Sequence, residues 1–131
     1  MTDVTRSVIS KIVRDAARNP QAFLPVPPAM FHILVAVADQ DRHGYAIMQD
    51  VASRTDGALK LSPGTLYGSI KRLLEDGLIV EVSKRPRPED DDERRRYYRI
   101  TAFGRSVAQA EATRLTTLLR QARAVGVRPV G

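Results

Sequence analysis

The sequence contains no cysteine and no tryptophan among its 131 residues. Without cysteine there is no disulfide framework and no thiolate metal site. No apolar run approaches the roughly 18 residues that a membrane span requires. The charged N-terminal segment also lacks the apolar core of a secretory signal. The length favours a single domain, and we expect a cytoplasmic protein that does not enter membranes.

Motifs of the common catalytic sites are lacking too. The sequence contains no phosphate-binding GxxxxGKS or GxxxxGKT, no dinucleotide-binding GxGxxG and no GxSxG nucleophile elbow. Its two histidines form no HExxH metal motif. We expect His32, in an apolar segment, to pack inside, and His43 to be a polar residue at a helix start. The sequence therefore predicts a protein that is not an enzyme and that needs neither a metal nor a cofactor.

Basic residues exceed acidic ones, and the excess is uneven along the chain. The formal net charge is +6, of which residues 1–61 contribute +1 and residues 62–131 contribute +5. A basic half favours a polyanionic partner such as nucleic acid. Charge alone does not decide the function, because many soluble proteins carry a similar excess that serves solubility.

Apolar spacing in the first half of the chain predicts helices around one proline-rich segment. An N-terminal helix ends near Asn19, before a proline. Four prolines in residues 20–28 exclude regular structure, and we interpret this segment as a stiff linker. Three compact helices are then expected, separated by a polar turn over residues 39–44. They cover about residues 28–38, 45–55 and 62–76.

The second half predicts a two-stranded β-ribbon and a long helix. Residues 78–83 and 95–100 are rich in β-branched and aromatic residues and flank a charged loop, which is typical of a hairpin. Thr101 is placed to cap a final helix that ends near Ala124. The fold class is thus mainly α with a two-stranded β-wing, a winged helix-turn-helix with an N-terminal helix and a long C-terminal dimerisation helix. The divisions are 1–27 for the N-terminal helix and linker, 28–100 for the winged helix, and 101–131 for the dimerisation helix and tail.

The start of the predicted 62–76 helix offers small polar groups to the outside. A helix tip of this kind approaches a phosphate chain or base edges closely, and its free backbone N–H groups attract phosphate. Lys71 and Arg72, one turn further, would extend this contact. An ordinary capped surface helix with solvated charges explains the helix taken alone equally well. The candidate DNA-binding residues at this tip are Ser62, Gly64, Thr65, Tyr67 and Ser69.

Arginines on both sides of the charged loop favour the DNA-binding interpretation. If the two strands pair, Arg95 and Arg96 reach a phosphate or a minor groove. The five acidic residues at 89–93 repel DNA, so we interpret them as a solvated tip, and a plain solubilising loop is an equal alternative. Tyr45, at the start of the third helix, either contacts the DNA backbone or packs.

The final helix carries an apolar seam at alternating steps of four and three residues, which is typical of a helix–helix interface. The N-terminal helix has apolar residues at steps of four and is expected to join the same interface. Both faces predict a homodimer. The candidate interface residues are Val4, Val8, Ile12, Ala108, Ala112, Leu115, Leu118, Leu119 and Ala122.

At HGYAIMQDV, SPGTLYGSIKRLLEDGLI and ERRRYYRITAFG the chain resembles the PadR-like transcriptional regulators, over about residues 33–119. The resemblance implies a winged-helix DNA-binding domain and a dimerising C-terminal helix. It also implies a repressor, and a small aromatic or cationic effector bound near the dimer interface. The family's frequent interface tryptophan has no counterpart here, so a flat aromatic pocket of that kind is not supported.

These observations together predict a homodimeric repressor that binds an inverted-repeat operator in double-stranded DNA, with a small-molecule effector as a further partner. Its two recognition helices would enter major grooves about 34 Å apart. The alternative keeps the fold but not the DNA. In that case the chain is a winged-helix protein-interaction module that uses its acidic wing for docking.

Overall fold

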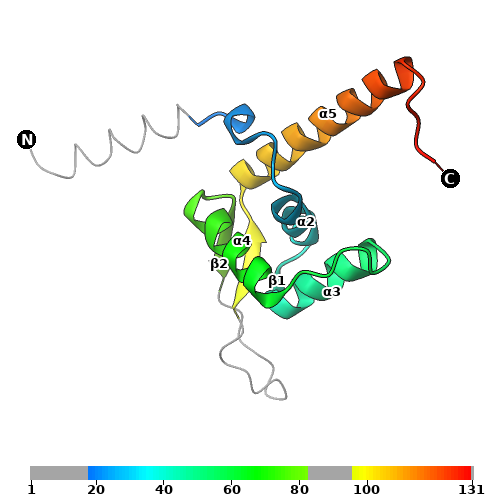
Figure 1. Ribbon diagram of the computed structural model, residues 1–131. Coiled ribbons are helices and arrows are strands. Elements are labelled where there is room, and N and C mark those ends of the chain that lie inside the picture. Colours follow the sequence, from blue (N-terminus) through cyan, green and yellow to red (C-terminus); the bar gives the residue numbers. More distant parts are fainter. Residues whose placement is uncertain (1–17, 83–95, 131) are drawn as a thin grey trace, which may run out of the picture.

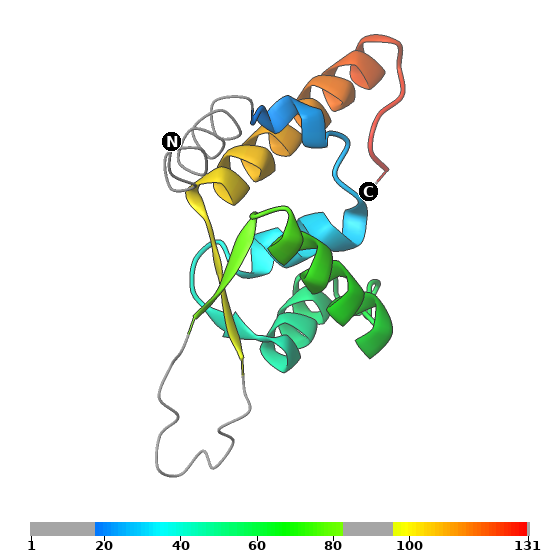
Figure 2. The same cartoon turned by 90° about the vertical axis from the view of Figure 1, so that its left-hand side faces the viewer.

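The computed structural model describes residues 18–82 and 96–130. Three helices pack together in the body: α2 (Pro28–Ala36), α3 (Gly44–Arg54) and α4 (Pro63–Glu75). A small sheet lies beside them, and the long helix α5 (Ala102–Ala124) crosses above and projects away from the body (Figures 1 and 2). This arrangement confirms the predicted winged-helix fold class and its long C-terminal helix. The predicted N-terminal helix lies outside the described residues.

The sheet has three antiparallel strands where the sequence predicted two. The predicted hairpin is present as β2 (Ile79–Val82) and β3 (Tyr97–Ile100), with Ile79 opposite Ile100. A third strand, β1 (Arg42–His43), pairs with the other edge of β3 and gives the order β1-β3-β2. The segment interpreted as a polar turn therefore adds a strand. Two residues are too few for an alternating pattern to reveal them.

The proline-rich segment is packed against the rest of the chain. It contains a short 3-10 helix, η1 (Pro20–Phe23), so the expectation that it holds no regular structure is corrected. The ring of Phe23 meets that of Phe103 on α5 edge to face, with centroids 5.4 Å apart. Val26 is buried in the core. Proline limits the backbone to a few conformations, but it leaves the apolar residues between the prolines free to pack.

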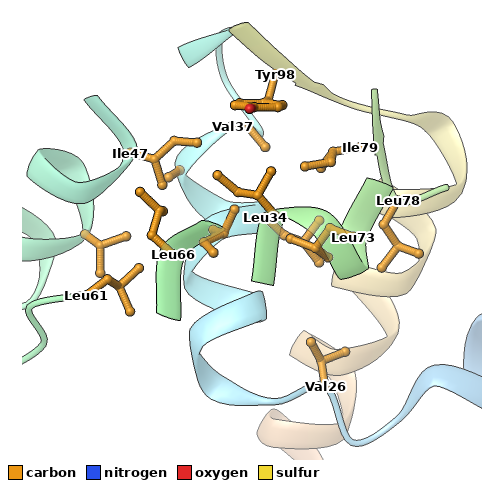
Figure 3. Close-up of a cluster of buried hydrophobic side chains, with 14 of the residues drawn as sticks. Val26, Leu34, Val37, Ile47, Leu61, Leu66, Leu73, Leu78, Ile79 and Tyr98 are labelled. Carbon is orange, nitrogen blue, oxygen red and sulfur yellow. The ribbon is translucent and has the colours of Figure 1, made fainter. Parts of the chain in front are cut away.

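The core lies where α2, α3, α4 and the sheet meet. Figure 3 shows Leu34 of α2 at its centre, with Ile47 of α3 on one side and Leu73 of α4 on another. On α4 only the face with Leu66, Ile70 and Leu73 is buried, as the helical period requires. Burial of that face fixes the opposite face of α4 toward the outside.

The start of α5 lies unusually close to the turn between α4 and β2. The backbone N–H of Thr101 donates to the carbonyl of Leu78 at 3.0 Å, and its hydroxyl donates to the carbonyl of Gly77 at 2.7 Å. The same hydroxyl accepts the N–H of Gly104 and so caps α5, which confirms the predicted helix start. A Cβ on Gly104 would lie 1.9 Å from the Leu78 carbonyl oxygen. Only glycine fits this contact.

A buried carboxylate ties α5 to the proline-rich segment. Glu111 is only 2% exposed. It accepts the backbone N–H of Val26 at 3.2 Å, and its two oxygens are each 2.7 Å from a nitrogen of the Arg114 guanidinium. The hydrogen bond from Arg114 lowers the pKa of Glu111 and outweighs the opposite effect of burial.

We expect Gly104→Ala to lower the free energy of unfolding by about 3 kcal/mol, since the added methyl group meets a backbone carbonyl that cannot rotate away. Thermal or urea unfolding followed by circular dichroism measures the change. Gly68→Ala is the matched control, because no described residue lies within 4 Å of a Cβ there and α4 gains helix propensity. Equal stability of the two variants would contradict the close packing of Gly104.

We expect Glu111→Gln to be less stable than the wild type at pH 7, with a difference that shrinks as the pH falls. Because the folded-state pKa of Glu111 is lowered, its contribution is complete above the unfolded value of about 4.3 and is lost as the pH falls through the folded value. Urea unfolding between pH 7 and pH 3 measures it, with Glu75→Gln as a control for loss of one carboxylate. A difference that is independent of pH would contradict this role.

Candidate nucleic-acid interface

The start of α4 is built as the sequence predicted. Ser62 is extended and caps the helix, its hydroxyl oxygen accepting the N–H of Thr65 at 3.2 Å. Pro63 occupies the first helical position, where its missing N–H costs nothing. The Ser62 hydroxyl also donates to the Thr65 hydroxyl oxygen at 3.1 Å. Two exposed hydroxyls therefore lie together at the end of the helix that carries the positive end of its dipole.

The outer face of α4 has small side chains around one aromatic ring. Gly64, Thr65 and Gly68 are exposed, Ser69 is half-buried, and Tyr67 is 51% exposed. Among residues 18–82 and 96–130, nothing lies within 4 Å of a Cβ built on Gly64 or Gly68. Because the side chains on this face are small, the helix backbone can approach another surface closely.

A second exposed tyrosine lies close to the first. Tyr45, 60% exposed, is in the first turn of α3, where His43 caps the helix by accepting the N–H of Ala46 on its Nδ1 at 3.1 Å. The ring of Tyr67 lies against Gly44, the residue before Tyr45. The structure thus places Tyr67 against the residue that precedes Tyr45, although the two tyrosines are 22 positions apart in the sequence.

Two basic residues follow on the exposed side of α4. Lys71 is exposed and makes no ion pair with the described part of the chain. Arg72 is exposed as well, and its Nε is 3.9 Å from a carboxylate oxygen of Asp76, a weak contact at the surface. Both cations remain accessible to a phosphate.

The base of the wing presents one of the two predicted arginines. Arg96 is exposed, and its Nε is 3.7 Å from Glu81 on the neighbouring strand β2. Tyr98, on the same face of β3 as Ile100, is buried in the core. Arg95 and the acidic tip at 89–93 lie outside the described residues.

The seam predicted on α5 divides into two parts. Ala108 is partly buried against the core of the same chain, whereas Leu115 and Leu119 are about two-fifths exposed. Leu118 is more than half exposed and lines the open cleft that is described in the next paragraph. Ala112 is exposed and Ala122 half-buried. Val4, Val8 and Ile12 lie outside the described residues.

An open cleft of about 460 Å³ runs between the proline-rich segment and α5. Leu24, Pro25 and Leu118 form its apolar wall, and Arg114, which is paired with Glu111, lines it as well. Sequence reasoning missed this cleft, because it interpreted the proline-rich segment as a connection only. Elsewhere among the described residues, no group of three metal-ligating side chains is present, and no helix in that part of the chain is long and apolar enough to cross a membrane.

Comparison with known sequences identifies one protein family. The family model described as "Transcriptional regulator PadR-like family" matches residues 33–110. The transcriptional regulator Rv3488 of Mycobacterium tuberculosis is 34% identical over 90 residues, which cover 69% of this chain and 78% of that protein. An uncharacterized protein of Lysinibacillus sphaericus is 34% identical over 78 residues, and the matched part covers 56% of this chain and 65% of that protein, just under two thirds.

Solved structures share the fold. A transcriptional regulator from Clostridium thermocellum is 25% identical with a TM-score of 0.63, and the match covers 76% of this chain and 90% of that one. A PadR family transcription regulator from Clostridium difficile R20291 is 21% identical, also with a TM-score of 0.63, over 76% of this chain and 98% of that one.

Proposed function

This chain belongs to the PadR-like family of transcriptional regulators, and we propose that it acts as a homodimer on an inverted-repeat site in double-stranded DNA. The observation that carries this proposal is the exposed face of α4. Its tip combines a capped helix N-terminus, small polar side chains and a tyrosine, and two cations follow it. Small side chains allow close approach, and hydroxyl and N–H groups bond to phosphates and base edges.

In the proposed complex, α4 is the recognition helix and enters the major groove with its N-terminal half. Ser62, Gly64, Thr65 and Ser69 line the approach, and Lys71 and Arg72 neutralise phosphates beside it. Tyr45 and Tyr67 contact the DNA backbone at the edge of the groove. Arg96, with Arg95 beside it in sequence, contacts the backbone from the base of the wing.

The proposed dimer forms along the free half of α5. Leu115 and Leu119 are each about two-fifths exposed there, and burial of this apolar surface against a second copy is favourable. Ala112 and Ala122 continue the same seam. Two recognition helices related by the dimer axis would meet half-sites about 34 Å apart.

We propose further that DNA binding represses transcription and that a small molecule relieves it. The support for a ligand site is the cleft beside α5, which combines apolar walls with polar lining residues such as Thr113 and Gln121. The cleft borders the proposed dimer face, since Leu118 lines it and Leu119 belongs to the seam. A ligand that binds one dimer geometry better than the other would shift the population between them and so change the half-site spacing.

We expect Lys71→Ala to weaken binding to the selected operator severalfold and to reduce the slope of log affinity against log salt by about 1, because one phosphate is no longer neutralised. Fluorescence anisotropy with a labelled operator, selected from fragments of the source genome, measures both quantities. Arg128→Ala, in the exposed tail beyond α5, removes the same charge and is the control. Should no genomic fragment bind the wild type, the protein-interaction alternative is favoured instead.

We expect Leu115→Glu to dissociate the dimer, because it would place charges in an apolar seam. Light scattering coupled to size exclusion gives the mass directly, and the domain should remain folded since Leu115 lies away from the core. Thr117→Glu is the matched control: two residues further on, it lies about 200° around the helix from Leu115. A dimer that survives Leu115→Glu would place the interface elsewhere.

A further inference from the structure

Tyr67 of α4 lies directly against the first residue of α3. A Cβ built on Gly44 would lie 2.7 Å from the hydroxyl oxygen of Tyr67 and 3.1 Å from its Cε1 and Cζ. Unstrained contacts of a carbon atom are about 3.5–4.0 Å. Any side chain at position 44 and the observed position of the Tyr67 ring therefore exclude each other.

The backbone at Gly44 does not itself require glycine. The glycines with positive φ are Gly57, Gly77 and Gly126 among the described residues, and Gly44 is not one of them. Glycine also lowers helix propensity relative to alanine. The space that the Tyr67 ring occupies is the remaining reason for a glycine at this helix start.

We propose that Gly44 is a positioning residue for DNA recognition: its missing side chain lets the Tyr67 ring rest on the start of α3 and so fixes the phenol hydroxyl there. This inference rests on the proposed function, because it takes Tyr67 as a DNA contact. A half-exposed tyrosine without such support would sample several rotamers and give up that freedom on binding. A ring held in place before binding avoids this entropy cost and gains affinity.

The contact at Gly44 differs from the close contact at Gly104 in which atoms have to move. A methyl group on Gly104 meets a backbone carbonyl, whereas one on Gly44 meets the far end of a side chain that can rotate outward. Gly44→Ala should therefore displace the Tyr67 ring and leave the fold intact. Its main effect should be on DNA affinity.

A double-mutant cycle tests the inference with the selected operator. Gly44→Ala and Tyr67→Ala should each weaken binding about tenfold, the order expected when one hydrogen bond to a charged group is removed. The double variant should also be about tenfold weaker, because the methyl group has no ring to displace once Tyr67 is alanine. The salt slope should stay that of the wild type in all three, since each variant keeps every charge.

Folding is checked on the same proteins by thermal unfolding and by nuclear Overhauser effects between the Hα of residue 44 and the Tyr67 ring. These effects should be strong in the wild type and absent in Gly44→Ala. The Tm loss caused by Gly44→Ala should be about 4 °C larger in the wild type than in the Tyr67→Ala protein. This difference corresponds to a coupling free energy near 1 kcal/mol for a domain of this size. If Gly44→Ala lowers the Tm, the addition of Tyr67→Ala should restore it.

Three results would overturn the inference. The first is a tenfold weaker affinity on Gly44→Ala in both backgrounds, since Gly44 would then act without Tyr67. The second is full affinity of Gly44→Ala although its Tyr67 ring has moved away from residue 44, and the third is full affinity of Tyr67→Ala. None of these removes DNA binding by the wild type, whereas failure of the proposed function does, so the two failures are distinguishable.

Discussion

The contact between α5 and the turn after α4 is the constraint on which the rest of the structure depends. Thr101 bonds to the carbonyls of Gly77 and Leu78, and Gly104 allows the two backbones to approach closely. This turn is the direct continuation of α4, so the direction of α4 is set relative to that of α5. In a dimer joined through α5, the separation of the two α4 helices would follow from this one contact.

Two further bonds hold the first half of α5 to the body at other points. Glu111 accepts the backbone N–H of Val26. The Arg105 guanidinium donates to the carbonyl of Ala38, a residue that lies just after the end of α2, at 2.5 Å. Beyond the cleft, no such hydrogen bond joins the second half of α5 to the rest of the described chain, and the leucines of this half are exposed. The helix thus combines an anchored half with a free half that is suited to contact another molecule. A movement of the free half would be transmitted along the continuous helix α5 to its contact with the turn after α4.

Local signals in the sequence were sufficient for most of this architecture. The starts of α4 and α5 were predicted from Ser62 and Thr101, because a hydroxyl cap and the apolar period that follows it lie within a few residues of each other. The missed features depend on residues far apart in the chain. Strand β1 exists because β3 offers it an open edge more than 50 positions later, and η1 is held against α5 by contacts such as that of Phe23 with Phe103. A propensity scale contains no information on either contact.

The same distinction separates the site residues predicted from the sequence and Gly44, which is proposed from the structure. Polar residues and cations at a helix tip can be recognised locally, whereas Gly44 resembles an ordinary glycine near a cap until Tyr67 is placed against it. The glycines of α4 present the opposite case. Gly64 and Gly68 weaken the helix and are not among the glycines with positive φ, and no described residue lies within 4 Å of a Cβ built on either. Internal packing among the described residues accounts for Gly44 and Gly104. In the proposed complex, the glycines on the open face of α4 let the DNA surface approach that helix closely.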